Sequence, residues 1–102
     1  MPHEQTGIRE RQRADTREPR HYCVIIHNDD FTTMDFVVEV LKEVFFMSET
    51  NAIALMLKVH EQGKATAGVY TRDIALSKAQ KAMAMARDKG FPLRLTVEPA
   101  EN

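Results

Sequence analysis

The chain has 102 residues, a formal net charge of −1 and a hydrophobic fraction of 43%. This length suits one domain with one modest core and is too short for two. A chain so close to neutrality lacks the basic excess of a typical nucleic-acid-binding surface, so we expect no nucleic acid as the main partner. Its only cysteine is Cys23, which excludes an intramolecular disulfide and favours a reducing compartment.

No apolar run approaches the roughly 20 residues that cross a bilayer, and the N-terminus has no apolar signal-peptide core. We therefore expect a cytoplasmic protein with no membrane association. Residues 1–20 carry charges of both signs and few apolar side chains. Such a segment buries too little surface to offset its ordering entropy, so we expect a flexible N-terminal extension before one folded domain, residues 21–102.

The folded part begins with residues 21–27, which are rich in aromatic and β-branched side chains and predict a strand. The turn-forming run Asn28-Asp29-Asp30 ends it. Thr32 is predicted to cap the helix that follows, with Asp35 three residues later completing a capping-box pair. The apolar face of this helix is made by Met34, Val37, Val38, Leu41 and Phe45.

Ser48 is predicted to begin a second helix, whose apolar face comprises Ala52, Leu55, Met56 and Val59. Gly63 stands where a glycine commonly ends a helix. Residues 64–70 predict a second strand, although alanine and glycine are weak strand formers. The pattern up to this point is β-α-α-β.

Thr71 is predicted to begin a third helix that ends at Gly90, with an alanine-rich buried face and Lys78 on its outer face. Residues 93–97 alternate apolar and polar side chains, which predicts a half-buried strand. The order β-α-α-β-α-β predicts an α/β (α+β) sandwich, in which three helices cover one face of a three-stranded sheet.

The run Asn28-Asp29-Asp30 allows two interpretations. Such residues form turns and place negative charge favourably near a helix N-terminus. They also offer convergent oxygen acceptors, which suit an ammonium group or a hard metal ion. His60, near the end of the second helix, is either a surface residue that interacts with the helix dipole or one further acceptor. Met34 either belongs to the core or lines an adaptable pocket.

Catalytic patterns are scarce in the sequence. There is no glycine-rich phosphate loop, no nucleophile elbow and no cysteine pair for zinc. A metal-dependent hydrolase that uses Asp29, Asp30 and His60 is the one catalytic alternative. A ribosome-stalk-like protein interaction domain is a second alternative, because it has a similar small α/β architecture. We expect a recognition module with no enzymatic activity, no metal and no cofactor.

Several separate segments resemble signatures of the ClpS family. The first is the run from Asn28 to Val37, and the others are residues 55–64, residues 68–71 and Pro92-Leu93. Together they place the resemblance over residues 21–98. It implies a monomeric adaptor that binds N-degron substrates beginning with Leu, Phe, Tyr or Trp. It further implies delivery of these substrates to the N-terminal domain of the ATPase ClpA, for degradation by ClpP.

The resemblance also implies roles for individual residues. Asn28, Asp30 and His60 would contact the α-amino group of the substrate, and Asp29 would add to the negative field. The side-chain pocket would be lined by Ile26, Thr32, Met34, Val37, Met56, Val59 and Leu93. Met34 would be the gate that excludes β-branched residues.

The same resemblance implies an ATPase-docking face on the third helix, around Asp73 and Lys78, and engagement of the extension, residues 1–20, by the ATPase. Three positions depart from the family pattern. Family members usually have Tyr where Phe31 stands, Pro where Thr33 stands and an acidic residue where Leu76 stands. Proline is pre-organised for a helix start, so Thr33 is expected to loosen it, and Leu76 bears on the ATPase contact. These departures are expected of a divergent second copy in the family.

Overall fold

The computed structural model describes residues 20–101. Its elements in chain order are β1 (His21–His27), α2 (Met34–Glu43), α3 (Glu49–Gln62), β2 (Lys64–Thr71), α4 (Arg72–Asp88) and β3 (Arg94–Pro99). This is the predicted order, and the predicted α/β class is confirmed. The expected flexible extension, residues 1–20, lies outside the described residues except for Arg20.

The three strands form one antiparallel sheet in the order β2-β1-β3, so the first strand is central. Ile26 of β1 pairs with Ala65 on one side and Leu95 on the other, and all three side chains are buried. The register with β2 shifts between Val24 and Ile25, which leaves Ala67 as the extra residue of a bulge. Because β1 pairs with a strand on each side, it supports the start of the loop that follows it.

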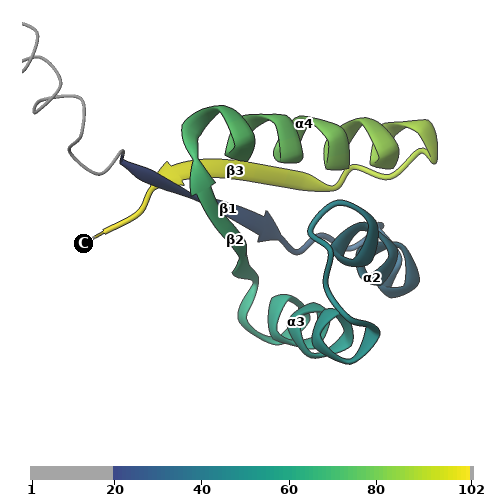
Figure 1. The fold of residues 1–102 in the computed structure, drawn as a ribbon. Coiled ribbons are helices and arrows are strands. Elements are labelled where there is room, and N and C mark those ends of the chain that lie inside the picture. Colours follow the sequence, from purple (N-terminus) through teal and green to yellow (C-terminus); the bar gives the residue numbers. More distant parts are fainter. Residues whose placement is uncertain (1–19, 102) are drawn as a thin grey trace, which may run out of the picture.

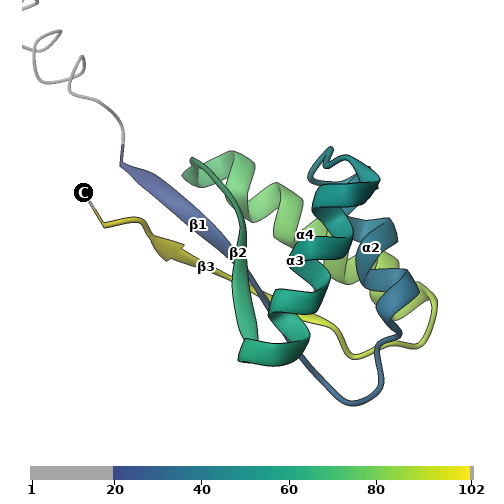
Figure 2. The same ribbon diagram turned by 90° about the horizontal axis from the view of Figure 1, so that it is seen from below.

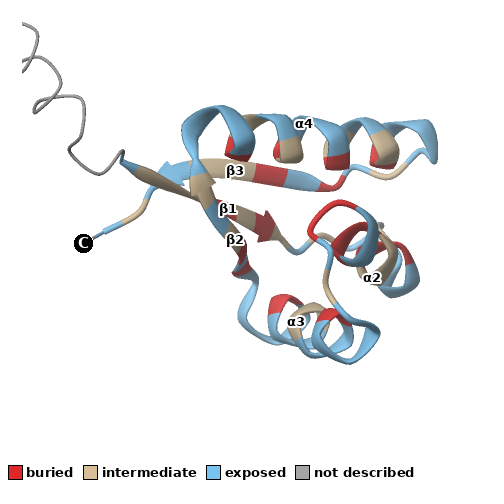
Figure 3. Ribbon diagram, viewed as in Figure 1, coloured by how far each residue is buried: buried red, intermediate tan, exposed pale blue. Residues whose placement is uncertain are grey.

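The helices cover the sheet unequally. Helix α4 packs against all three strands, α3 packs against β2, and α2 packs mainly against α3. Figures 1 and 2 show α4 lying along the sheet, with α2 and α3 together near the end of β1. The buried residues in Figure 3 face the space between these layers. On α4 they are Ala75, Ala79, Ala82 and Ala86, small side chains that let the helix lie close to the sheet.

The start of α2 differs from the prediction. Thr33, not Thr32, is the N-cap, and its Oγ1 accepts a hydrogen bond from the Phe36 amide at 3.1 Å. Thr32 is instead bound to the preceding loop, since its hydroxyl and amide both donate to Asp29. The predicted capping-box pair of Thr32 and Asp35 is therefore wrong. At the N-cap, Thr33 supplies a side-chain acceptor that proline lacks, and the expected loosening of the helix start stays a prediction.

The remaining boundaries follow the prediction closely. Ser48 caps α3, with its Oγ 3.2 Å from the amide nitrogen of Asn51, and Gly63 ends it with a φ of 90°. The burial of Lys78 differs from the prediction, because this residue is half-buried and does not lie on the outer face of α4. Among residues 20–101, no helix combines the length and hydrophobicity needed to cross a bilayer.

Candidate functional site

One cavity gathers most of the residues singled out from the sequence. It has a volume of about 220 Å³ and lies where the β1–α2 loop meets the first turns of α2 and the second half of α3. Its lining residues are Asn28, Asp29, Asp30, Thr32, Met34, Val37, Met56 and His60. Oxygen and imidazole acceptors thus share one cavity with apolar side chains.

Asp29 organises the loop that carries the acceptors. Its Oδ1 accepts hydrogen bonds from the amides of Phe31 at 2.8 Å and Thr32 at 2.6 Å, and its Oδ2 accepts from the Thr32 hydroxyl at 2.7 Å. Desolvation acts to raise the pKa of Asp29, but the hydrogen bonds from Thr32 and Phe31 and the charge of Arg87 outweigh it and lower that pKa. The Asp29 carboxylate is therefore ionised and directed at its own backbone.

The two polar halves of the cavity are joined through the backbone. The Asn28 amide donates to the Gly63 carbonyl oxygen at 2.8 Å. Gly63 ends α3 three residues after His60, so this bond ties the β1–α2 loop to the helix end that carries the imidazole. The side chains of Asn28, Asp30 and His60 are exposed. The polar end of the cavity is thus open to a charged group from solvent.

The apolar part of the cavity extends inward from an exposed rim. Met34 is 45% exposed and Val37 is buried, so these two residues of the same helix face mark the mouth and the interior. A smaller void of about 10 Å³ continues beside them and is bordered by Val59 and Leu93, among others. The depth of this pocket comes from the contact of α2 with α3 and from the loop before β3.

Two residues differ from the expected lining. Ile26 is fully buried in the core and borders neither of these two cavities. His27, which was not expected in the site, borders the small inner void. Its ring Nε2 lies 2.8 Å from Thr96 Oγ1, and its pKa is lowered by desolvation and by the charges of Arg94 and Lys64. The sequence signal that could have placed His27 in the site is its position directly before Asn28.

A metal centre finds no support at this site. Within residues 20–101, no three His, Cys, Asp or Glu side chains gather closely enough to hold a metal ion. Asp29, one of the ligands that a metal-dependent hydrolase would need, has both carboxylate oxygens occupied by hydrogen bonds from its own loop.

The two residues expected to meet an ATPase lie outside this cavity. Asp73 is exposed in the first turn of α4. Lys78, one turn further along, is half-buried and its Nζ donates to the Val44 carbonyl oxygen at 2.7 Å. The ammonium of Lys78 is therefore already engaged by the protein itself.

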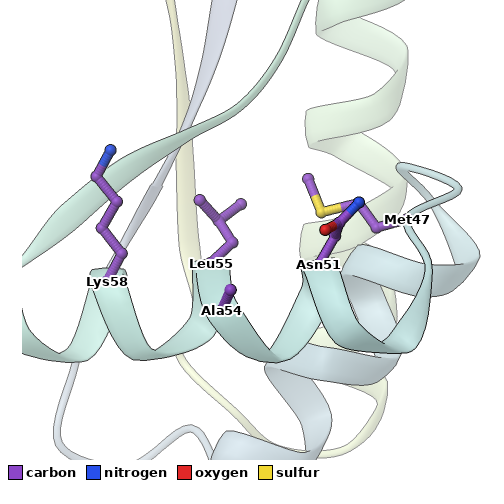
Figure 4. A pocket seen from close by; sticks show the side chains of 5 residues that line it. All are labelled: Met47, Asn51, Ala54, Leu55 and Lys58. Carbon is purple, nitrogen blue, oxygen red and sulfur yellow. The ribbon is translucent and has the colours of Figure 1, made fainter.

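A larger concavity of about 390 Å³ lies elsewhere, along α3 and the loop before it. Figure 4 shows its lining side chains, Met47, Asn51, Ala54, Leu55 and Lys58. It has no carboxylate, and its one charged group is a lysine. Such a lining suits an apolar contact but repels an ammonium group, so the smaller acidic cavity is the candidate site.

Comparison with known proteins agrees with this architecture. Residues 17–96 match the family described as ATP-dependent Clp protease adaptor protein ClpS. The ATP-dependent Clp protease adapter protein ClpS of Myxococcus xanthus is 52% identical over 85 residues, covering 83% of this chain and 79% of that protein. The protein of the same name from Neisseria gonorrhoeae is 49% identical over 86 residues, covering 84% and 83%.

A solved structure shows the same fold. Agrobacterium tumefaciens ClpS2 bound to L-phenylalaninamide superposes with a TM-score of 0.79 and 43% sequence identity, covering 81% of this chain and all of that one. The extent and level of these matches, together with the predicted signature segments, show that the chain belongs to the ClpS family of Clp protease adaptors.

Proposed function

We propose that this protein is an adaptor that binds the N-terminal residue of N-degron substrates and delivers them to a Clp ATPase for degradation. The observation that carries the proposal is the cavity in which exposed acceptors adjoin an apolar pocket. A protein N-terminus with a bulky first residue has the complementary chemistry, an ammonium group next to an apolar side chain. The adaptor contributes recognition and has no catalytic step of its own.

In this proposal Asn28, Asp30 and His60 contact the α-ammonium group. An ammonium has three N–H donors, and a carboxylate, an amide oxygen and a neutral imidazole nitrogen can each accept one. Charge-assisted hydrogen bonds of this kind contribute about 1.5–3 kcal/mol each. Asp29 supports them by holding the loop, since both of its oxygens accept hydrogen bonds from Phe31 and Thr32.

The first side chain of the substrate would enter the apolar pocket past Met34. Burying a Leu or Phe side chain contributes roughly 1.5–3 kcal/mol, and a cavity of about 220 Å³ suits one such side chain, not an extended ligand. After association costs, these contributions leave an affinity around micromolar, about −8 kcal/mol. L-Phenylalaninamide, the ligand of the related ClpS2, combines a free amino group with a bulky aromatic side chain, which supports this assignment.

Delivery requires a second surface. We assign it to the N-terminal part of α4, around exposed Asp73 and half-buried Lys78, with ClpA as the ATPase and residues 1–20 as the segment that it engages. The protein would act as a monomer in the cytoplasm, where a single free cysteine such as Cys23 stays reduced. Membership of a family of Clp protease adaptors supports this partner class.

The test is a fluorescence titration with peptides that differ only at residue one. Peptides beginning with Leu, Phe, Tyr or Trp should bind at about micromolar concentration, while peptides beginning with Lys or Gly should not. Acetylation of the Leu peptide should abolish binding, because it removes the ammonium group. Asp30→Asn should weaken binding of the Leu peptide by about tenfold, as expected for loss of one charge-assisted hydrogen bond.

Circular dichroism of the Asp30→Asn variant controls for folding. Equal affinity for the free and acetylated peptides would rule out recognition of the α-amino group. Unchanged affinity in the Asp30→Asn variant would remove Asp30 from the site while leaving the adaptor role intact.

A further inference from the structure

Arg87, in the last turn of α4, holds the loop that joins α4 to β3. Its Nη1 donates one hydrogen bond of 2.8 Å to the carbonyl oxygen of Phe91 and another of 2.8 Å to that of Leu93. Hydrogen bonds from a charged donor are stronger than neutral ones, and this guanidinium nitrogen has two N–H groups for the two acceptors. Arg87 thus draws the carbonyl groups on either side of Pro92 towards one point.

The same loop, residues 89–93, is attached to the fold at both of its ends. The amide of Phe91 donates to the Ala86 carbonyl oxygen at 2.8 Å, and the Phe91 ring packs on that of Phe36, with centroids 5.1 Å apart. Pairing of β3 with β1 begins at Arg94. Figure 2 shows the loop passing beside α2. The hydrogen bond from Arg87 to Leu93 therefore fixes the segment between these two attachments.

Leu93 is the residue of this loop that reaches the candidate substrate site. It is 1% exposed and borders the inner void of about 10 Å³. The other residues around this void include Asn28, Asp29 and Val37 of the larger cavity. A void of this size has room for at most one water molecule. Leu93 therefore forms a wall at the deep end of the pocket, and a small movement of this wall changes the space available there.

The guanidinium of Arg87 also acts on the loop that carries the acceptors. Desolvation acts to raise the pKa of Asp29, but hydrogen bonds from Thr32 and Phe31 and the positive charge of Arg87 lower it. A charge has such an effect only when it lies close to the carboxylate. Arg87 therefore lies near both halves of the site, although it borders neither the cavity nor the inner void.

We infer that Arg87 is a positioning residue of the substrate pocket, which holds Leu93 at the deep end and thereby sets the size of the first side chain that the pocket prefers. This inference rests on the proposed function, because it takes the cavity as the site of that side chain. Arg87 itself does not touch the substrate. Without Arg87, residues 91–93 lose both hydrogen bonds, and the inner void opens into the main cavity.

A deeper pocket has different consequences for small and large side chains. The side chain of a substrate Leu leaves the added space unfilled and loses dispersion contacts with the wall that has moved. The indole of a substrate Trp is larger and fills the added space, so it keeps its contacts. Loss of Arg87 should therefore shift the preference from Leu towards Trp, whereas a general loss of structure would weaken both by the same factor.

The test measures the affinity of the full chain for two peptides that differ only in beginning with Leu or Trp. Arg87→Met keeps the length of the side chain but removes its charge and its donors. It should weaken binding of the Leu peptide severalfold and that of the Trp peptide by less than about twofold. Arg87→Lys should behave like Arg87→Met, because the shorter lysine lacks the fixed fork of the guanidinium and does not reach both carbonyl oxygens.

A double-mutant cycle connects the effect to Leu93. Leu93→Val removes one methylene group from the wall, a change mild enough for the protein to stay folded, and should shift the preference in the same direction. Arg87→Met should change the ratio of Leu to Trp affinity less in the Leu93→Val background than in the wild type, because the wall that it holds has already been cut back. The melting temperature of each variant checks its folding.

Lys89→Met is the matched control. Lys89 is exposed at the end of the same helix, two residues after Arg87, and its substitution makes the same change of charge. It should leave the ratio of Leu to Trp affinity at the wild-type value. A shift as large as that of Arg87→Met would attribute the effect to charge and overturn the inference. A wild-type ratio in Arg87→Lys would overturn it too, since charge alone would then be sufficient.

The outcomes separate the inference from the proposed function. If the wild-type chain binds neither peptide, or binds the acetylated forms equally well, the proposed function is wrong and the inference falls with it. If the wild type binds both peptides but Arg87→Met weakens them by the same factor, the inference is wrong and the substrate site stands. The same conclusion follows if Arg87→Met shifts the ratio equally in the Leu93→Val background.

Discussion

The three residues of the β1–α2 loop have different surroundings although they are adjacent in sequence. Asp29 directs both carboxylate oxygens at Phe31 and Thr32, and the pKa of Asp29 is lowered as a result. Asn28 and Asp30 are exposed at the mouth of the cavity. One acidic residue therefore shapes the loop, and its neighbours are accessible to a ligand.

The first prediction concerns acid stability. Because the folded-state pKa of Asp29 lies below its unfolded value of about 3.9, its contribution to stability is present above that pH and is lost as the pH falls through the folded-state pKa. Urea unfolding at pH 7 and pH 3 should therefore show a smaller loss of unfolding free energy in Asp29→Asn than in the wild type. An equal loss in the two proteins would contradict this role for Asp29.

The second prediction concerns the rim of the pocket. Met34 is 45% exposed and borders the cavity where a substrate side chain would enter. Met34→Ala should widen the mouth, so that peptides beginning with Ile or Val bind within about tenfold of the Leu peptide. Leu57→Ala, a truncation of an equally exposed side chain on α3, should leave this discrimination unchanged. Continued exclusion of Ile and Val by Met34→Ala would place the gate elsewhere.

At the scale of elements, the ends of helices bring the site together. Gly63 ends α3 with a φ of 90°, and its carbonyl oxygen accepts the Asn28 amide. Thr33 begins α2 with a side-chain cap. The loop that carries the acceptors is thus fixed at one end by a long-range hydrogen bond to the end of α3 and at the other by the local cap of α2. The His60 imidazole lies within the last turn of the helix that Gly63 terminates.

The third prediction compares two glycines. An added Cβ has no neighbour within 4 Å at either Gly63 or Gly90, and both have positive φ, so the cost of alanine at each is backbone strain of about 1 kcal/mol. Chemical unfolding should show a similar loss of stability in Gly63→Ala and Gly90→Ala. Only Gly63→Ala should also weaken binding of the Leu peptide, by severalfold, because of the two glycines only Gly63 accepts a hydrogen bond from Asn28. Equal affinities of Gly63→Ala and Gly90→Ala for the Leu peptide would mean that the hydrogen bond between Gly63 and Asn28 does not position the site.

At the scale of the whole molecule, the candidate substrate cavity lies at the start of α2, whereas Lys78 of the proposed docking face contacts Val44 at its end. The cavity draws on the β1–α2 loop, α2 and α3, and all of its lining residues fall between Asn28 and His60. The proposed docking face around Asp73 and Lys78 draws on α4, which Lys78 connects to the end of α2. In the proposed function, binding and delivery would therefore depend on separate groups of residues in one small domain.

The fourth prediction tests this separation. Deletion of residues 1–19 removes no residue of the described fold, so the melting temperature and the affinity for a Leu peptide should change little. Degradation of a Leu-initiated reporter by the Clp protease should fall severalfold, because we assign the extension to the ATPase. Degradation at the wild-type rate would remove the extension from that role. Loss of peptide binding would show that these residues complete the substrate site.

Much of the fold was predictable from local patterns. The strand 21–27, the helix ends at Ser48 and Gly63, and the alternation in residues 93–97 all depend on side chains close together in the chain. The choice between Thr32 and Thr33 as helix cap was not predictable, because both residue types cap well. In the structure Thr33 accepts the amide of Phe36, while Thr32 donates its own amide and hydroxyl to Asp29.

By itself the sequence determined the order β-α-α-β-α-β, the acceptor run Asn28-Asp29-Asp30 and the family, because these depend on residue types and their spacing. Only the tertiary structure decided which of the candidate residues meet. It brought His60 and Met56 to the acceptor run, withdrew Ile26 into the core, and placed the Lys78 ammonium on Val44 instead of in solvent. The physical reason is that these contacts join residues far apart in the chain, and packing between helices determines them.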